Sequence, residues 1–376
     1  MLHIGRSYIV RVDGVSRLCA DLTIGNRRTT LWFGVDSTQE EYLTLGRADA
    51  FVMAVLPCAM RGRHEIVCED PMSERLHHQL VNGLIPALSF AGERYHLIKI
   101  TAPLTTEQIP NHGAVGTGFS GGVDSLYTIM KHDAASEFPL THIAVFPRRF
   151  YDKSIFLQLC RHGSGFAQEL DLKQVYLDSN MGQVLKETYS EVYSFRNYAC
   201  ALALQGLFSF YLLSSGKSVW EFKFDFDHVS YYDPLTVNCT STESLSFYLS
   251  GAETTRAKKL EALTAWEPSC RWLHPCTNVL PGGFNCGRCR KCCCDLTVLY
   301  ALGELDRYRS VFDVDDYLSR FPQRIGLLLS IENNRHCIDA LQALKERNIA
   351  IPDYSVSFAK QIKKAREQQA AKLENQ

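Results

Sequence analysis

Apolar and polar positions follow two different rhythms along the chain, and the change comes near residue 110. In the first part, β-branched and aromatic runs bounded by Gly- and Asn-containing turns predict strands, and two stretches with helical spacing predict helices. The strands are expected over residues 8–12, 28–33, 65–68 and 96–100, and the helices over residues 39–60 and 72–88. Residues 1–110 are therefore expected to form an α+β unit that ends in a linker over 103–110.

Beyond residue 110, short apolar runs alternate with amphipathic stretches. This alternation predicts an α/β fold with a doubly wound parallel sheet, in which ligands bind beyond the carboxyl ends of the strands. The strands are expected over residues 114–119, 142–146, 175–177 and 219–224, and the helices over residues 125–132, 154–170 and 196–214. The whole chain is expected to comprise residues 1–110, an ATP-binding domain over 111–270, a zinc knuckle with C-terminal helices over 271–355, and a polar tail over 356–376.

One stretch, from Tyr198 to Gly216, contains 19 consecutive residues without a charge. It carries Gln205 and several serines, and Arg196 and Lys217 bracket it closely, which favours a buried core helix over a membrane span. The first residues of the chain do not resemble a signal segment, and we expect a cytoplasmic protein.

The composition narrows the class of protein. Apolar residues make up 46% and charged residues 22% of the chain, as in globular proteins. The 40 Lys and Arg and 41 Asp and Glu give a formal net charge of −1, which argues against a strongly basic nucleic-acid-binding protein. Seven of the 14 cysteines lie between Cys270 and Cys294. Such a local cluster indicates a metal site before a disulfide framework, and the scattered cysteines are expected to pack as small apolar residues.

The run from Ser120 to Ser125, Ser-Gly-Gly-Val-Asp-Ser, follows the expected strand over 114–119 and opens the next helix. The two glycines allow a tight turn that points backbone N–H groups at phosphate oxygens, the serines add hydroxyl donors, and the helix start adds its positive dipole end. Asp124, expected in an exposed loop, would repel phosphate unless a cation lay between them, which implies Mg²⁺. The alternative is a Gly-Gly turn with a capping Ser or Asp.

This loop resembles the pyrophosphate loop of the PP-loop ATP pyrophosphatases, which cleave ATP to AMP and pyrophosphate and use AMP to activate an oxygen of the substrate. The resemblance implies catalytic roles for Ser120, Asp124 and Arg196, with Mg²⁺ as a cofactor. It also implies a set of nucleotide-binding residues at the loop, at the end of the second strand and at the start of a later helix. These residues are Gly118, Phe119, Ser120, Gly121, Gly122, Val123, Asp124, Ser125, Val145, Phe146, Arg196 and Asn197.

The cysteine cluster predicts a structural zinc site. Cys286, Cys289 and Cys292 form two consecutive C-x-x-C steps, and Cys276 can complete a tetrahedral set of four thiolates. A Cys-ligated iron–sulfur cluster is the alternative, because the spacing does not exclude one. Cys293 and Cys294 point differently on the following helix and are expected to pack, and Cys270 is a reserve ligand.

Together, the loop and the cysteine cluster resemble the 7-cyano-7-deazaguanine synthases, which convert 7-carboxy-7-deazaguanine to the nitrile with ammonia and ATP and carry a structural zinc. Residues 195–197, Phe-Arg-Asn, and 230–233, Ser-Tyr-Tyr-Asp, resemble two further steps of that family, so the resemblance covers residues 112–305. Where the family has Ser-Lys-Ala-Glu, this chain has a glycine, Gly251. Arg256 or Lys259, one and two helical turns later, can deliver the missing charge, and the alternative is that both are solvated surface charges.

The resemblance implies an ATP-dependent, AMP-forming ligase that adenylates a small-molecule carboxylate to form an amide or nitrile. In one variant the acid is joined to an amine on a protein, with residues 1–110 docking that partner or mediating assembly; a homo-oligomer is expected. The alternatives are a PP-loop enzyme that modifies tRNA and a catalytically silent nucleotide-binding subunit.

Overall fold

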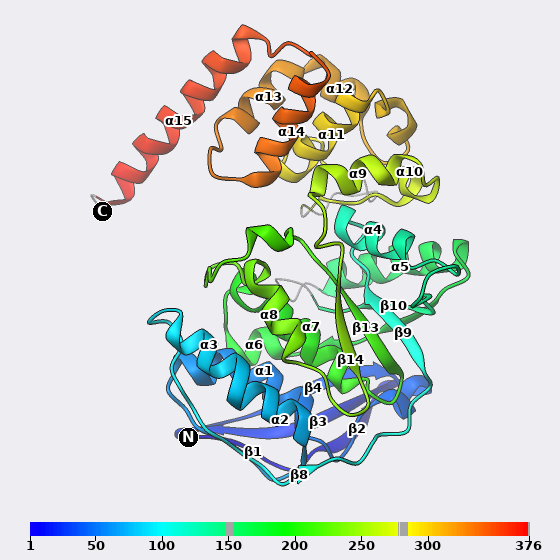
Figure 1. Ribbon diagram of the computed structural model, residues 1–376, viewed down its shortest axis with the longest axis vertical. Helices are drawn as coiled ribbons and strands as arrows, with labels where there is room; N and C mark the ends of the chain where they lie inside the picture. Colours follow the sequence, from blue (N-terminus) through cyan, green and yellow to red (C-terminus); the bar gives the residue numbers. More distant parts are fainter. Residues whose placement is uncertain (148–152, 277, 279–284, 375–376) are drawn as a thin grey trace. The chain divides into compact units, whose positions relative to one another are not determined.

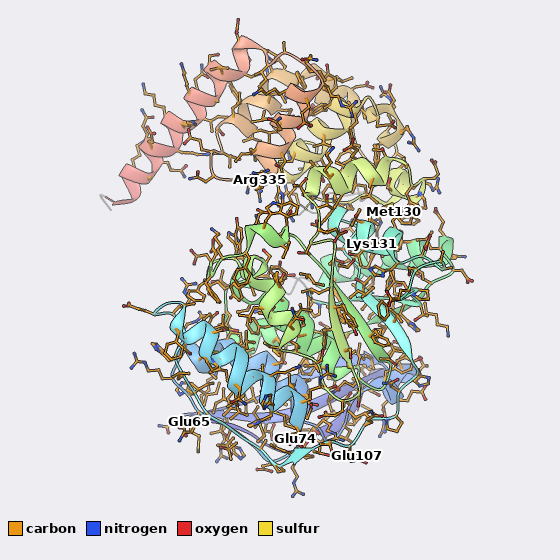
Figure 2. All side chains as sticks on the ribbon, in the orientation of Figure 1. Glu65, Glu74, Glu107, Met130, Lys131 and Arg335 are labelled. Carbon is orange, nitrogen blue, oxygen red and sulfur yellow. The ribbon has the colours of Figure 1, made fainter. Side chains whose placement is uncertain are left out.

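A computed structural model of the protein describes residues 1–147, 153–276, 278 and 285–374. By its internal contacts the chain forms two compact units: residues 1–119 with 131–253, and residues 120–130 with 254–376. Met130 and Lys131, labelled in Figure 2, mark the point in helix α4 (Val123–Lys131) where the chain passes from the second unit back to the first. The contacts divide the chain into these two units and do not test the four regions expected from the sequence, which stay a prediction.

The first unit contains a seven-stranded mixed sheet in the order β12-β4-β3-β1-β5-β7, with β2 paired to β3. Its longest pair is the antiparallel hairpin of β3 and β4, which turns at Gly25 in a left-handed conformation with φ of 59°. The strands are β1 (Leu2–Ile4), β2 (Tyr8–Val12), β3 (Val15–Ile24), β4 (Arg27–Asp36), β5 (Ile66–Cys68), β7 (Ile100–Thr101) and β12 (Asp178–Ser179). The strand expected over 96–100 is thus reduced to its last residue, and β1, β3 and β12 are additions to the expected set.

The two helices expected before residue 110 are both shorter or more broken than the pattern predicts. Residues 39–60 divide into a 3-10 helix over Ser37–Tyr42 and the buried helix α1 (Asp49–Arg61). The second stretch begins as the short strand β6 (Met72–Ser73), which pairs with β8 (Leu104–Thr105), and continues through α2 (Glu74–Gln79), a π-turn and α3 (Ile85–Phe90). Apolar spacing does not distinguish these local variations of helical geometry.

The N-terminal residues share one apolar core with the sheet that follows them. Helix α1 packs against α7 (Tyr189–Ala203), and strand β12, from the middle of the chain, pairs with β4 at the edge of the N-terminal sheet. A single cluster of buried side chains runs from Leu2 to Phe247. Residues 1–110 therefore belong to the first unit and share its apolar core.

A second sheet in the first unit has five strands, all parallel, in the order β11-β10-β9-β13-β14 (Figure 1). The strands are β9 (Ala114–Gly118), β10 (His142–Val145), β11 (Lys173–Tyr176), β13 (Phe208–Ser214) and β14 (Ser246–Ser250). Numbered along the chain this order is 3-2-1-4-5, so the winding reverses at β9, the position where doubly wound sheets bind ligands. The expected α/β fold with a parallel sheet is confirmed.

The sequence predicts one buried helix over the uncharged stretch from Tyr198 to Gly216. The structure divides this stretch into a helix and a strand. Helix α7 ends at Ala203, and the residues after it form the buried strand β13 beside β9. A Cβ atom at Gly206, in the turn between them, would lie 2.8 Å from the carbonyl oxygen of Glu41. Continuous burial removes the polar positions that would distinguish a helix from a strand, so composition alone cannot show the break.

The prediction of a strand over 219–224 is also wrong. Residues Val219–Glu221 form a 3-10 turn, and Trp220 and Phe222 are exposed. The fifth parallel strand is β14, which the sequence analysis did not predict.

The regular elements that the structure describes in the second unit are all helices. Helix α11 packs against α14, and α13 packs against α15, the last helix of the chain. The helices are α9 (Arg256–Thr264), α10 (Pro268–Trp272), α11 (Arg290–Leu302), α12 (Val314–Ser319), α13 (Phe321–Leu329), α14 (Arg335–Glu346) and α15 (Asp353–Glu374). Among the described residues, no helix is both long and apolar enough to cross a membrane.

Candidate functional site

The loop over 120–125 is closed by its own hydrogen bonds. Gly121 has a φ of +68°, a left-handed conformation that favours glycine and lets the chain turn into α4. Ser120 Oγ accepts a bond from the Gly122 amide at 3.2 Å and lies 3.0 Å from Ser125 Oγ, which donates to the Gly122 carbonyl at 3.0 Å. From outside, the amide of His274 donates to the Gly121 carbonyl at 2.6 Å. The loop is therefore preorganised before any ligand binds.

Asp124 is held by two cations from helix α9. Its Oδ1 lies 3.1 Å from Lys259 Nζ, and its Oδ2 accepts a bond from Arg256 Nη1 at 2.8 Å. The Asp124 side chain is 23% exposed and the Lys259 side chain only 1%. The prediction that Asp124 lies in an exposed loop is wrong, because helix α9 covers its carboxylate.

The sequence of α9 explains how it presents two cations on one face. Thr255 caps the helix by accepting a hydrogen bond from the Lys258 amide, so Arg256 stands in the first turn and Lys259 follows three residues later on the same face. Arg256 is fixed further by Asp295 of α11, to which its Nε and Nη2 donate at 3.2 and 2.9 Å. Two cations and two carboxylates thus form one nearly buried cluster.

The charges in this cluster keep Asp124 ionised. Burial by itself would raise the pKa of Asp124, but Lys259 and Arg256, with a smaller contribution from His336, hold it well below the ordinary range. Burial raises the pKa of Asp295, although Arg256 opposes the shift. Asp295 and His336 were not identified from the sequence, because no motif or spacing connects them with a loop far away in the chain.

Four predicted nucleotide-binding residues lie at the ends of the central strands in the first unit. Gly118 ends β9, the Phe119 amide donates to the Ala144 carbonyl at 2.8 Å, and the Phe119 ring stacks on Phe166. Val145 ends β10 and is fully buried, and Phe146 stacks on Tyr211. The side chains of Phe119, Val145 and Phe146 therefore serve the core, and their backbone groups are what a ligand could contact.

Arg196, expected to be catalytic, lies in α7 and is 6% exposed. One of its Nη groups donates to the Glu187 carbonyl at 3.4 Å, and the guanidinium carbon lies 5.9 Å from the Tyr189 ring centroid. Burial, opposed by Arg61 and Arg196, raises the pKa of Glu187 to about 7. Asn197, one residue further, is partly buried. The structure thus gives Arg196 acidic and aromatic neighbours that the sequence analysis did not predict.

Two segments that the sequence analysis singled out are in contact in the first unit. Ser194, next to the 195–197 step, donates its hydroxyl to Asp233 Oδ1 at 2.6 Å. Asp233 is fully buried at the start of α8 (Asp233–Asn238), and burial raises its pKa to about 7. Although Ser194 and Asp233 are 39 positions apart in the chain, the fold places a partly protonated carboxyl beside the helix that carries Arg196.

The four predicted metal ligands are brought together in the second unit. The Sγ atoms of Cys276, Cys286, Cys289 and Cys292 all lie within 4.8 Å of one another. The Sγ atom of Cys292 lies 3.9 Å from that of Cys286 and 3.5 Å from that of Cys289, close to the edge of about 3.8 Å expected for a tetrahedron of thiolates around zinc. The four-cysteine cluster fits a structural metal such as zinc, with every position filled by protein.

Backbone and amide donors surround this cluster. The Cys289 amide donates to Cys286 Sγ at 3.3 Å, and the Cys286 amide donates to Cys276 Sγ at 3.5 Å, as expected for groups that stabilise thiolates. Asn285 ties the cluster to its unit, because its Nδ2 donates to the carbonyls of Leu273 and Val311, both at 2.9 Å. Asn285 is a supporting residue that the spacing of the cysteines does not reveal.

The neighbouring cysteines lie outside the ligand set. Cys293 is fully buried, and burial raises its pKa to about 12, as expected for a packing residue. Cys294 Sγ lies 3.7 Å from Cys337 Sγ on α14, and Cys270 is buried in α10. The expectation that Cys293 and Cys294 pack on the helix agrees with their positions.

Comparisons of the chain with protein-family models, with curated proteins and with solved structures found no match in any of the three. Function is therefore inferred from the residues and their geometry.

Proposed function

We propose that the protein is an ATP-dependent, AMP-forming ligase that adenylates a carboxylate, 7-carboxy-7-deazaguanine or a relative, and passes the acyl group to ammonia or to an amine on a protein. The observation that carries the proposal is the closed loop over 120–125, which follows the central strand of a 3-2-1-4-5 parallel sheet. Backbone turns at this position bind phosphate groups in many α/β folds.

In the proposed reaction the substrate carboxylate attacks the α-phosphorus of ATP and pyrophosphate departs. The amides of Gly121 and Gly122 and the hydroxyl of Ser120 hold the departing pyrophosphate, because donors fixed in advance stabilise developing negative charge without reorganisation. The nitrogen nucleophile then attacks the acyl carbon. The bond between this carbon and the bridging oxygen breaks, and AMP leaves with that oxygen on its phosphate.

Lys259 is the best candidate for the positive charge that the chain lacks at Gly251. Arg256 is fixed on two sides, by Asp124 and by a two-point contact with Asp295. Lys259 has a flexible stem and a single charged group, so it can follow a phosphate oxygen with less rearrangement than a clamped guanidinium. Both cations are already within 3.1 Å of a loop carboxylate, as the role requires.

The residues present are compatible with Mg²⁺. Each oxygen of Asp124 accepts one bond from α9 and keeps a second lone pair, and the side chain remains 23% exposed. Asp124 would hold the ion, which when bound neutralises phosphate charge. Arg256 and Lys259 set the position of that carboxylate beforehand.

The test is the identity of the products. The protein is incubated with Mg-ATP, ammonium and 7-carboxy-7-deazaguanine, and the nucleotides are resolved by chromatography. AMP and pyrophosphate in equal amounts, formed only when the acid is present, are expected. ADP and phosphate as the only products would overturn the adenylation mechanism, whereas AMP formed only with another acid would change the substrate.

Two neighbouring lysines provide a matched pair of variants. Lys259→Met is expected to lower the rate about a hundredfold, the usual effect of removing a charge that stabilises the transition state. Lys258→Met removes an exposed lysine that pairs with Glu261 on the same helix, and its rate is expected to stay within about twofold of the original. Equal rates for the two variants would exclude Lys259 from the reaction.

A further inference from the structure

Two adjoining cavities lie in the helical unit, and two arginines line both of them. One cavity, of about 610 Å³, lies beside the cysteine cluster and is lined by Cys286, Arg288, Arg320 and Arg324 among others. The other, of about 430 Å³, is lined by the same Arg320 and Arg324 and by side chains of α13 and α15. Both volumes lie in the range of about 300–1,000 Å³ that is usual for sites of small ligands.

The charges of the larger cavity favour an anion. Arg320 and Arg324 share a single carboxylate, that of Asp316, at 3.0 and 2.6 Å. The Arg320 side chain is 63% exposed and the Arg324 side chain 14% exposed. Arg288 makes no ion pair within those residues and is exposed. Guanidinium groups that are not fully neutralised and lie together at one wall bind phosphate in pairs of hydrogen bonds.

Acidic groups oppose this charge only in part. Asp313 also lines the larger cavity, and Arg309 is held at its rim by Asp306 and Asp315 at 2.8 and 3.0 Å. With Arg309 paired in this way, Arg288, Arg320 and Arg324 face the two carboxylates of Asp313 and Asp316. The wall therefore keeps an excess of positive charge.

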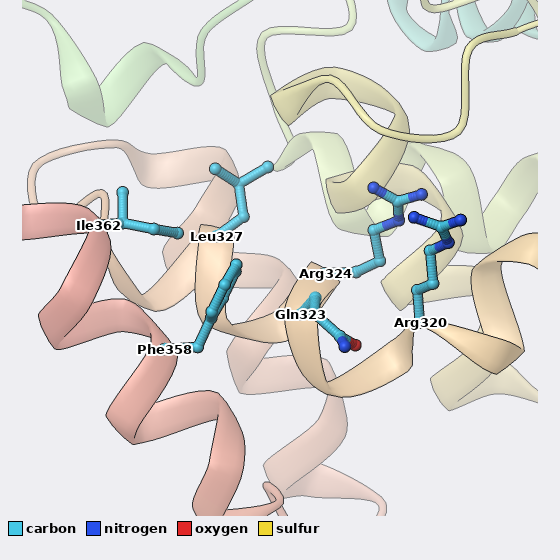
Figure 3. A pocket seen from close by; sticks show the side chains of 6 residues that line it. All are labelled: Arg320, Gln323, Arg324, Leu327, Phe358 and Ile362. Atoms are coloured by element: carbon cyan, nitrogen blue, oxygen red, sulfur yellow. The ribbon is translucent and has the colours of Figure 1, made fainter. Parts of the chain in front are cut away.

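The smaller cavity has a different character. Leu327 of α13 and Phe358 and Ile362 of α15 form an apolar wall opposite the two arginines, as Figure 3 shows. Gln323 lies between the arginines and this wall, and its Oε1 is buried. An apolar wall that includes an aromatic ring suits the flat face of a base.

Charge is distributed unevenly along the chain. The second unit contains 19 Lys and Arg against 15 Asp and Glu, a net charge of +4, so the first unit carries −5 of the total of −1. Helix α15 carries further cations on both sides of Ile362. Lys360 and Lys364 are both exposed. The near-neutral total that argues against a nucleic-acid partner thus hides a basic unit.

We propose that these adjoining cavities bind a nucleotide, with its phosphate on Arg288, Arg320 and Arg324 and its base against Leu327, Phe358 and Ile362. The ligand is either a free nucleotide or one unit of a single-stranded RNA. This site lies apart in sequence from the loop over 120–125 and does not depend on the ligase reaction.

The experiment uses the full-length protein and two probes, a short fluorescein-labelled single-stranded RNA followed by anisotropy and AMP followed by calorimetry. Arg320→Gln/Arg324→Gln is expected to weaken the probe that occupies the cavities by about tenfold or more. For RNA, the dependence of binding on salt is expected to become shallower by about one unit of slope per arginine removed. Weakening of RNA binding alone identifies a strand, and weakening of AMP binding identifies a free nucleotide.

Two controls make the result decisive. Arg335→Gln removes an exposed arginine of the same unit that pairs with Asp339 and lines neither cavity, and it is expected to change affinity less than about twofold (Figure 2). Lys259→Met removes a charge that faces Asp124 and lines neither cavity, so AMP binding lost in this variant and kept in the arginine variant belongs to the loop over 120–125. The proposal is overturned if neither probe binds, if the arginine double variant binds both probes as the original does, or if Arg335→Gln weakens binding equally. Unchanged circular dichroism and metal content show that the double variant is folded.

Discussion

At the residue scale, the most consequential arrangement is the pairing of Asp124 with two cations. Lys259 is almost fully buried, and removing its carboxylate partner leaves a charge away from water. Asp124→Asn is therefore expected to lower the free energy of unfolding by about 3 kcal/mol, in addition to any loss of activity. Urea unfolding followed by fluorescence measures this change.

Glu261→Gln, which removes a carboxylate that is 37% exposed on the same helix, is the control and is expected to cost less than about 1 kcal/mol. The pKa of Asp124 is lowered in the folded protein, so its contribution is present above the ordinary value near 3.8 and is lost as the pH falls below it. Equal stabilities of the two variants at neutral pH would show that Lys259 is not confined as the structure has it.

A second residue-scale prediction concerns Asp233. Its pKa rises from an ordinary 3.8 to about 7 because the carboxyl is fully buried with one oxygen lacking a partner among the described residues. The folded protein holds this proton longer than the unfolded chain, so the free energy of unfolding falls as the pH rises across that interval. Asp233→Asn cannot ionise and is expected to flatten the pH dependence, measured as the urea midpoint at a series of pH values.

Glu187, whose pKa is also raised to about 7, still contributes in that variant. Part of the slope therefore remains after Asp233→Asn and becomes shallower when Glu187→Gln is added, while Asp49, whose pKa burial raises to about 6, keeps its own contribution. A pH profile identical to that of the original protein would show that Asp233 is ionised in the folded state.

At the scale of elements, the cysteine cluster lies at the N-terminal end of helix α11. Cys289 is the N-cap residue of α11, so the metal would fix the beginning of a helix that packs against α9, α13 and α14. The protein is expected to contain about one zinc per chain. Cys289→Ser is expected to lose the metal and to lower the melting temperature, because binding energy is folding energy at a structural site.

Cys293→Ser is the matched variant, since Cys293 is buried on the same helix and lies outside the ligand set. Metal analysis of the two purified proteins separates the roles. Loss of the metal in Cys293→Ser would show that the ligands have been misassigned, and iron in place of zinc would identify the cluster as the alternative that the spacing leaves open.

A second feature at the scale of elements is the turn near residue 206, which joins helix α7 to strand β13. Gly206 lies against backbone, with the carbonyl oxygens of Glu41 and Tyr42 at 2.8 and 3.0 Å from the place of a Cβ atom. Gly206→Ala is expected to cost about 1–3 kcal/mol, because backbone cannot move aside as a side chain can. At Gly5 the nearest atom to such a Cβ is 3.5 Å away, so Gly5→Ala is expected to cost less, and urea unfolding compares the two.

At the scale of the whole molecule, the N-terminal residues are structural. The buried cluster that runs from Leu2 to Phe247 includes α1 and the face of α7 on which α1 packs. A chain that begins at Asn111 would expose this face, and it is expected to be insoluble or to lose cooperative unfolding. Solubility and a thermal melt test this, with a chain that ends at Arg366 as the control, since the residues after it in α15 are exposed where they are described. A soluble, cooperatively unfolding product would show that residues 1–110 are dispensable for the fold.

Several features of this protein are determined by the sequence alone because they depend on near neighbours. The loop over 120–125 and the cysteine steps at 286–292 bring their groups together through turns of a few residues, so their spacing is sufficient to predict the geometry. The alternation of strands and helices after residue 113 likewise predicts a parallel sheet, since parallel strands need a crossover between them. The cap at Thr255 and the cations that follow it are also readable in the sequence, although what they face is not.

Only the tertiary structure decides which distant groups meet. Asp124 contacts Lys259 across 135 positions, and Ser194 contacts Asp233 across 39, and no local pattern carries either pairing. The stretch from Tyr198 to Gly216 divides into a helix and a strand because β9 and β14 offer hydrogen-bond partners to residues 208–214. A buried apolar segment satisfies its backbone equally well in either form, so its neighbours and not its own side chains choose between them.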